Sequence, residues 1–235
     1  MAHKTVDVQG LGVVKLHKRR GVHSLKLSVS PDGLIRISMP FWVPYSAGAE
    51  FARNKRAWIL GQLLEQRILS NGDLIGKTHR LEFVTDNHAL NIRTRITSKG
   101  QIRVLYPAHQ TFSDKAVQSA AHKASLRALK QQSEKILPVR LRSLATDHGF
   151  SYKNVRIKQL KSRWGSCSSD KEIVLNSFLV QLPWHLIDYV LLHELVHTRI
   201  MAHGNPFWTE LSKYVPNLKS VRREIKSHKP FLLTE

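Results

Sequence analysis

The sequence predicts an α+β protein in which a twisted, mostly antiparallel sheet lies beside several helices. Two kinds of pattern favour this class. Residues 24–30 and 34–39 alternate apolar and polar side chains, as half-buried strands do, whereas 46–70 repeats apolar residues at helical spacing and 113–137 begins at a helix-capping pair and ends before a proline. The chain has 235 residues, 42% of them hydrophobic, so it can bury a substantial core.

The first third of the chain is predicted to hold three strands and a helix. The strands are expected at 13–16, 24–30 and 34–39. A turn at Pro31-Asp32-Gly33 joins the last two into an antiparallel hairpin. A helix at about 46–70 would end at Asn71-Gly72. Its apolar positions are Phe51, Trp58, Ile59 and Leu63.

The middle of the chain repeats this alternation of strands and helix. Strands that extend the sheet are expected at 81–84, 90–93 and 102–105. A helix that Asp114 can cap should run to about Leu137 and end before Pro138, with a short helix following to Asp147.

The last third is predicted to contain two strands and two helices. The strands are 155–158 and 172–176, one helix begins near Pro183, and an amphipathic helix spans about 205–214. By composition, residues 1–110 form a β-rich region with one helix, and 111–235 form a helical segment followed by the site-bearing region. No internal repeat or clean linker is evident, so about 11–225 is interpreted as one continuous domain.

Two histidines four residues apart, His193 and His197, flank a glutamate, and His203 follows six residues later. A spacing of four places both imidazoles on one helix face, where they can reach one metal ion. Glu194 is rotated by about 100° from His193, so it can stand beside the ion as a general base. Segment 202–206, Ala-His-Gly-Asn-Pro, contains residues that end helices and would turn His203 back toward the pair.

Neither chance nor core packing accounts well for this motif. A chance occurrence of the full pattern is expected about 2 times in 1000. The histidines could instead be hydrogen-bonded core residues of an apolar helix, but burying them with Glu194 is costly without a metal. Three neutral imidazoles favour Zn2+ and leave a fourth position for water, whose proton Glu194 can accept. The chemistry indicated is hydrolysis, and zinc is the only cofactor predicted.

A second motif, Lys161 to Ser169, precedes the last strand. Within it, Gly165 and Ser166 let the backbone approach a ligand, Trp164 can form the wall of a pocket, and Arg163 can pair with a carboxylate or phosphate. These four residues are the predicted substrate-binding residues. A tight turn with a core tryptophan is the structural alternative. Cys167 is expected to be a small buried residue rather than a ligand.

The net charge of +20 is unevenly distributed. Residues 151–235 contain 13 Lys and Arg and 7 Asp and Glu (net +6), which leaves 24 and 10 (net +14) for 1–150. Such a field attracts polyanions, so this half could bind DNA or RNA; a solvated basic surface explains the charge equally well. The basic helix between Ala116 and Lys135 has the same two interpretations, of which the solvated face is favoured.

Several features bear on the cellular compartment. No apolar stretch approaches the ~20 residues of a membrane span, and the N-terminus lacks the apolar core of a secretory signal. The single cysteine, Cys167, fits a reducing compartment. The sequence therefore predicts a cytoplasmic protein with no membrane partner.

The motifs together resemble a known family, the YgjP-like predicted metal-dependent hydrolases, which are related to the SprT and WLM metallopeptidases. The matching segments are SRWGSCSS (162–169), Asp188-Tyr189-Val190, HELVH (193–197), His203 and Phe207-Trp208. The match is close in 150–225 and looser in 11–140. The resemblance implies a zincin-like fold, with zinc bound by His193, His197 and His203 and with Glu194 as catalytic base. Metzincins share the ligand spacing but place a glycine where this chain has Ile200, which disfavours that relationship.

Three functions are compatible with these patterns. The first is a zinc-dependent peptidase acting on a peptide or protein, for which the resemblance to SprT and WLM proteins implies substrates attached to DNA. The second is a zinc-dependent nucleoside triphosphate pyrophosphatase, to which YgjP-like proteins have been linked, with Arg163 and Lys18-Arg19-Arg20 as phosphate clamps. The third is a nucleic-acid-binding protein with a structural zinc site. The peptidase is favoured, although no residue is identified as the oxyanion donor.

Overall fold

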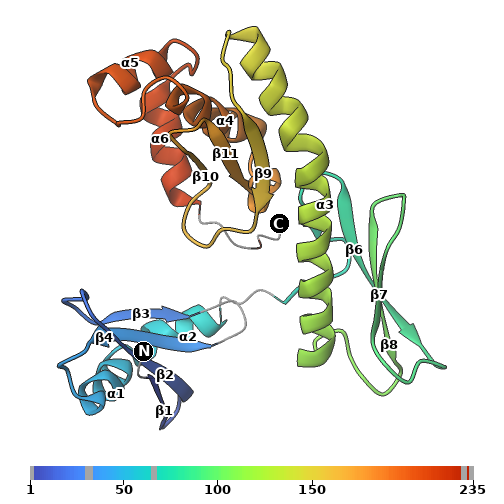
Figure 1. Cartoon of the computed structure of the whole chain (residues 1–235). Coiled ribbons are helices and arrows are strands. Elements are labelled where there is room, and N and C mark those ends of the chain that lie inside the picture. The colour runs from blue at the N-terminus through green and yellow to red at the C-terminus, as the bar shows by residue number, and fades with distance from the viewer. Residues whose placement is uncertain (1–2, 30–33, 65–67, 229–231, 233–235) are drawn as a thin grey trace. The chain divides into compact units, whose positions relative to one another are not determined.

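The computed structural model describes residues 3–29, 34–64, 68–228 and 232 (Figure 1). The predicted turn at 31–33 and the side chain of Leu63 lie outside what it describes. The chain divides into two compact units, Met1–Ile68 and Leu69–Glu235. The division thus precedes the second group of strands, and does not fall near residue 110, because those strands pack on the long helix that follows them.

The N-terminal unit is a four-stranded sheet with two helices. Its strands are β1 (His3–Val8), β2 (Gly12–Arg19), β3 (Lys26–Val29) and β4 (Ile35–Pro40), in the order β1-β2-β4-β3. Helices α1 (Tyr45–Asn54) and α2 (Arg56–Leu64) replace the single helix predicted at 46–70. The prediction was wrong because the backbone leaves helical geometry at Lys55 (ψ 14°). The core contains Val14, Leu16, Ile35, Ile37, Met39, Ala52 and Ile59.

The second unit opens with another four-stranded sheet. Its strands are β5 (Leu74–Ile75), β6 (His79–Asp86), β7 (Arg93–Ile96) and β8 (Gln101–Pro107), in the order β5-β6-β8-β7. Helix α3 (Lys115–Asp147) follows and lies along this sheet in Figure 1. It runs through Pro138, where the sequence predicted an end. Buried side chains on both sides of that residue, among them Leu137 and Leu141, keep the helix packed and offset the lost hydrogen bond.

The two four-stranded sheets are copies of one arrangement, offset by 67 residues. Val14 pairs with Ile35 in the parallel β2–β4 ladder, and Leu81 pairs with Ile102 in the parallel β6–β8 ladder. The antiparallel ladders β3–β4 and β7–β8 keep the same offset, as do the pairs shared by β1–β2 and β5–β6. The chain therefore contains an internal structural repeat that the sequence analysis missed, because few residues other than Arg36 and Arg103 or Pro40 and Pro107 are identical.

The remaining elements form a third sheet and four helices. They are β9 (Asn154–Lys158), β10 (Gly165–Cys167), β11 (Glu172–Asn176), the 3-10 helix η1 (Ser177–Gln181), α4 (Trp184–His197), α5 (Asn205–Ser212) and α6 (Leu218–Ser227). The sheet order is β10-β11-β9, with β11 parallel to β9. Every sheet thus contains a parallel pair. The α+β class is confirmed, and five of the eight described strand pairs are antiparallel. The prediction of a single sheet was wrong, because the described strands form three mixed sheets whose neighbours are chosen by packing between segments distant in sequence.

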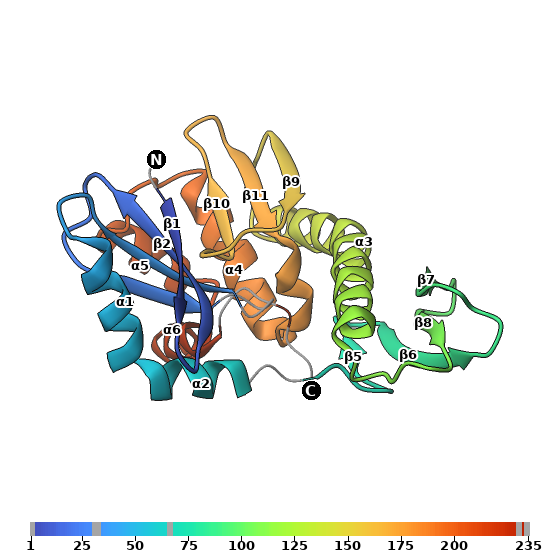
Figure 2. The same ribbon diagram turned by 90° about the horizontal axis from the view of Figure 1, so that it is seen from below.

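Helix α4 is fixed between the third sheet and α3 (Figure 2). Its side chains Leu191 and Leu195 are fully buried. Arg140 on α3 donates two hydrogen bonds of 2.7 Å, from Nε and Nη2, to the carboxylate oxygens of Asp188 on α4. None of the described helices is both long and apolar enough to cross a membrane.

The β5–β6 turn is held to α3 by one buried glutamine, and its removal should destabilise the second unit. Gln132 Oε1 accepts hydrogen bonds from the backbone N–H groups of Lys77 and Thr78, and its Nε2 donates to the Ile75 carbonyl. Gln132→Ala leaves the buried Ile75 carbonyl and two partly buried N–H groups without this partner and should cost about 3 kcal/mol in urea unfolding. The exposed neighbour Gln131 is the control, since Gln131→Ala should change stability by less than about 0.5 kcal/mol. Equal effects of both changes would contradict this role.

Candidate metal centre

Three histidine side chains converge at the C-terminal end of α4. His193 and His197 lie one helical turn apart on α4, and His203 comes from the loop before α5. Their Nε2 atoms are 3.2 Å apart between His193 and His197, 3.1 Å between His197 and His203, and 3.0 Å between His193 and His203. The structure therefore brings together all three residues that the sequence predicted as ligands.

The chain turns sharply after α4 to return His203. Thr198 caps the helix end, its Oγ1 donating to the Leu195 carbonyl at 2.7 Å. Pro206 lies in the first turn of α5, and Trp208 Nε1 donates to the His203 carbonyl at 3.0 Å, which fixes the loop. Phe207 is fully buried, and its ring centre lies 4.5–4.8 Å from those of all three imidazoles. It forms an apolar floor under the three histidines.

This arrangement fits a divalent metal ion. In a tetrahedral site with metal–nitrogen bonds of about 2.0–2.1 Å, ligand nitrogens are about 3.3 Å apart, close to the separations seen here. His197 Nδ1 lies 3.1 Å from the Ile200 carbonyl, so it can donate there and leave Nε2 free for a metal. Burial, followed by the charges of His197, His203 and Arg222, lowers the pKa of His193 to about 3. Its ring is therefore neutral, as a metal ligand must be.

Glu194 is buried next to the three histidines. Its side chain is 4% exposed, and its Oε2 has no hydrogen-bond partner among the described residues. Burial raises the pKa of Glu194 to about 8, while the charge of Arg163 opposes the rise. A carboxyl group with this pKa exchanges protons near neutral pH. A bound cation would lower its pKa again.

The predicted substrate-binding residues surround this carboxylate to different extents. Gly165 and Ser166 lie on β10, and a Cβ added to Gly165 would stand 2.6 Å from Glu194 Oε1. Arg163 precedes the strand, and its charge acts on Glu194. Trp164 packs against the core, which agrees with the structural alternative for that residue. Cys167 is half-buried, and burial together with Glu194 raises its thiol pKa to about 11.

Sequence reasoning assigned no role in the site to three residues that shape it. Asn176 is fully buried, and its Nδ2 donates to the carbonyls of Leu160 and Arg163 at 2.8 Å, which holds the loop leading to β10. Arg222 on α6 stacks its guanidinium 3.6 Å from the centre of the Trp208 ring, and its charge acts on His193. Tyr189, one turn before His193, has its ring 5.9 Å from that imidazole. No local motif marks Asn176 or Arg222, because each acts through tertiary contacts.

The burial of Glu194 predicts a pH effect on the stability of the metal-free protein. A raised pKa means that the folded state binds the proton more tightly than the unfolded state between pH 4.5 and about 8, so the unfolding free energy falls as pH rises through this range. Glu194→Gln removes this loss. We would measure urea unfolding after the metal has been removed with a chelator. The free energy of unfolding of the variant minus that of wild type should be larger at pH 8 than at pH 5.

The depressed pKa of His193 acts in the opposite sense, because it removes stability as pH falls from 6.5 toward 3. Both proteins retain His193, so its effect cancels in the comparison. A stability difference between variant and wild type that does not change with pH would contradict the prediction.

A comparison with models of protein families finds a match over most of the chain. The model of the YgjP-like metallopeptidase domain matches residues 23–228. The chain belongs to the YgjP-like family. Membership makes this YgjP-like protein a metallopeptidase-family hydrolase and agrees with the resemblance seen in the sequence. No curated protein matches it.

Two solved structures are also similar to part of the YgjP-like chain. The metallopeptidase zymogen jannalysin of Methanocaldococcus jannaschii has 26% identity and a TM-score of 0.34, over 39% of this chain and 94% of its own. The metallopeptidase zymogen abylysin of Pyrococcus abyssi has 26% identity and a TM-score of 0.36, over 39% of this chain and 93% of its own.

Proposed function

We propose that this YgjP-like protein is a zinc-dependent peptidase of zincin type, with His193, His197 and His203 as ligands. The observation that carries the proposal is the convergence of three Nε2 atoms within 3.2 Å of one another beside a buried carboxylate. Three neutral imidazoles suit Zn2+ and leave a fourth position open. A bound zinc ion would polarise the scissile carbonyl and make an attacking water more acidic.

Glu194 is proposed as the general base. Its Oε2 has no partner among the described residues, so it is available to take a proton from the attacking water and to return it to the leaving amine. The apolar surroundings that raise its pKa make the protonated form accessible in the second step. Tyr189 and Arg222, which act on or contact His193, are proposed to stabilise developing negative charge.

The segment Arg163 to Ser166 is proposed to bind the substrate. Strand β10 is an edge strand, paired only with β11 among the described strands, and lies against the helix that carries the ligands. Arg163 can pair with a substrate carboxylate. The remaining backbone groups of β10 are then available to an extended peptide.

Metal removal tests the proposal directly. Dialysis against a chelator should abolish hydrolysis of an unfolded protein substrate, and stoichiometric Zn2+ should restore it. Full activity of protein shown to be metal-free would refute the peptidase mechanism. Retention of zinc with no hydrolysis of any peptide would favour a structural zinc site instead, since a structural site needs no open position.

Nucleoside triphosphate hydrolysis is the second candidate. Its support is the positive charge of Arg163 and Arg222 acting on the site. The Lys18-Arg19-Arg20 cluster proposed as a phosphate clamp belongs to the N-terminal unit. Release of pyrophosphate or phosphate from a triphosphate, dependent on zinc and without peptide cleavage, would favour this candidate. A cytoplasmic location and association with nucleic acid stay predictions from the sequence.

A further inference from the structure

The internal repeat allows the N-terminal sheet to be compared with a copy of itself. Because side chains alternate along a strand, Lys15, His17 and Arg19 of β2 share the sheet face that is opposite to the buried Val14 and Leu16. At an offset of 67, the corresponding residues of β6 are Glu82, Val84 and Asp86. The fold of the two sheets is the same, so the basic residues of β2 are not required by the fold.

The neighbouring strand β4 shows a second difference in charge between the two sheets. Arg36 of β4 pairs in register with Lys15, which places like charges side by side and costs stability. In the copy, Arg103 occupies the position of Arg36 and forms an ion pair with Glu82, with Nε and Oε2 2.9 Å apart. The N-terminal sheet has Lys15 at the position of Glu82, so this ion pair is absent there among the described residues. Residues 3–29 and 34–64 contain ten Lys and Arg and only two acidic residues, Asp7 and Glu50.

The positive charges of this face act on His17. Burial lowers the pKa of His17, and the charges of Arg36, His3, Arg19 and Lys15 lower it further. His3 stacks on His17 with ring centres 5.8 Å apart. An anion would relieve the repulsion among these groups.

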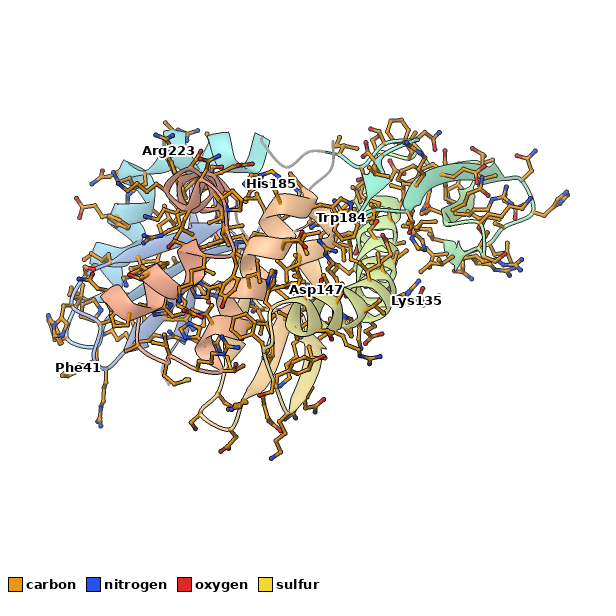
Figure 3. The ribbon with its side chains drawn as sticks, turned by 90° about the horizontal axis from the view of Figure 1, so that it is seen from above. Phe41, Lys135, Asp147, Trp184, His185 and Arg223 are labelled. Carbon is orange, nitrogen blue, oxygen red and sulfur yellow. The ribbon has the colours of Figure 1, made fainter. Side chains whose placement is uncertain are left out.

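Exposed aromatic rings lie where β4 ends, next to the end of β2. Phe41 and Trp42 directly follow Pro40, which pairs in register with Arg19, and their side chains are 55% and 56% exposed. Figure 3 shows Phe41 pointing away from its unit. The two rings contact each other edge-to-face at 5.1 Å, and the ring centre of exposed His23 lies 6.3 Å from that of Trp42. In the copy these positions are Ala108, His109 and Leu90.

We propose that this surface, formed by Lys15, Arg19, Arg36, Phe41 and Trp42, binds single-stranded nucleic acid. Cations that follow a phosphate backbone, next to exposed rings on which unpaired bases stack, are what such a ligand requires. Charge alone would suit any polyanion, but the exposed aromatic pair selects a strand with accessible base faces over a duplex, whose bases are already stacked. The proposal is independent of the peptidase mechanism, because it concerns binding by a surface that contains no residue of the metal centre.

Fluorescence anisotropy with a labelled oligothymidylate of about 20 nucleotides tests the proposal on the full-length chain. The charge variant Lys15→Glu/Arg19→Asp introduces the residues of the copy. Its control, Arg93→Glu/Arg95→Asp, makes the same change of charge on exposed residues of the other sheet. We expect the first variant to weaken binding about tenfold or more and the second by less than about threefold. Equal weakening would show a diffuse effect of the net charge and overturn the proposal.

The aromatic contribution has its own matched pair. Trp42→Ala should weaken binding about tenfold through lost stacking, whereas Trp58→Ala, which removes a ring that is 48% exposed on α2, should have little effect. Arg36→Ala provides a milder second variant, and circular dichroism verifies the fold of each protein. Binding of a duplex of the same length as tightly as the single strand, with no effect of Trp42→Ala, would overturn the assignment. Hydrolysis of a short peptide should be unchanged in all these variants.

Discussion

Glu194→Gln is expected to keep the bound metal and to lower peptide hydrolysis by about 10³-fold. Glutamine has nearly the same shape as glutamate, so the three histidines should stay in place, but its amide cannot accept a proton from water. General acid–base catalysis typically contributes 10²–10⁴-fold. Metal content by atomic emission and kcat/KM for a peptide substrate would be measured together on the same preparations.

A second glutamate provides the matched control for this experiment. Glu224 lies on α6 and contacts His185 Nε2 at 3.0 Å, outside the metal centre. Glu224→Gln should leave kcat/KM within about twofold of wild type. If Glu194→Gln retained peptide hydrolysis at the level of Glu224→Gln, Glu194 would not be the base. If Glu194→Gln lost only the hydrolysis of nucleoside triphosphates, the activity that depends on Glu194 would be nucleotide hydrolysis.

Gly165→Ala is expected to lower kcat about 10²-fold while leaving the metal bound. The added Cβ would stand 2.6 Å from Glu194 Oε1 and 2.9 Å from its Cδ and Cγ, closer than van der Waals contact allows. Either β10 or the carboxylate must therefore move, and a displacement of about 1 Å at a catalytic group can cost this much. The three atoms nearest to the added Cβ all belong to Glu194 and none to a ligand, so metal content should not change.

Gly204→Ala is the control that distinguishes this steric effect from a loss of activity caused by any added methyl group near the metal centre. Gly204 follows the ligand His203, but a Cβ there would meet only Pro206 Cδ, at 3.6 Å, and its φ of −79° suits any residue. Its kcat should stay within about twofold of wild type. Equal loss of activity in the two variants would show that Gly165 has no specific role in positioning Glu194. Loss of metal in Gly165→Ala would likewise contradict this positioning role.

Much of the secondary structure could be predicted because the signals are local. The alternation in 34–39 corresponds to β4, segment 172–176 is β11 without any shift, and the helix expected from Pro183 is α4. Errors occurred where a neighbour in space overrides a local preference. Pro138 lies inside a continuous helix, and the strand expected at 90–93 is found at Arg93–Ile96, where it pairs with β8.

The amino-acid sequence alone is enough to predict the chemistry that the metal centre can support, because the spacing of His193, Glu194 and His197 on a helix is a property of local geometry. The close return of His203, the glycine that lies against Glu194 and the action of Arg222 on His193 from α6 are seen only in the folded chain. The same holds for the two stretches 67 residues apart that have one strand order with different surfaces. These features depend on contacts between segments distant in the chain, which periodicity and spacing do not encode.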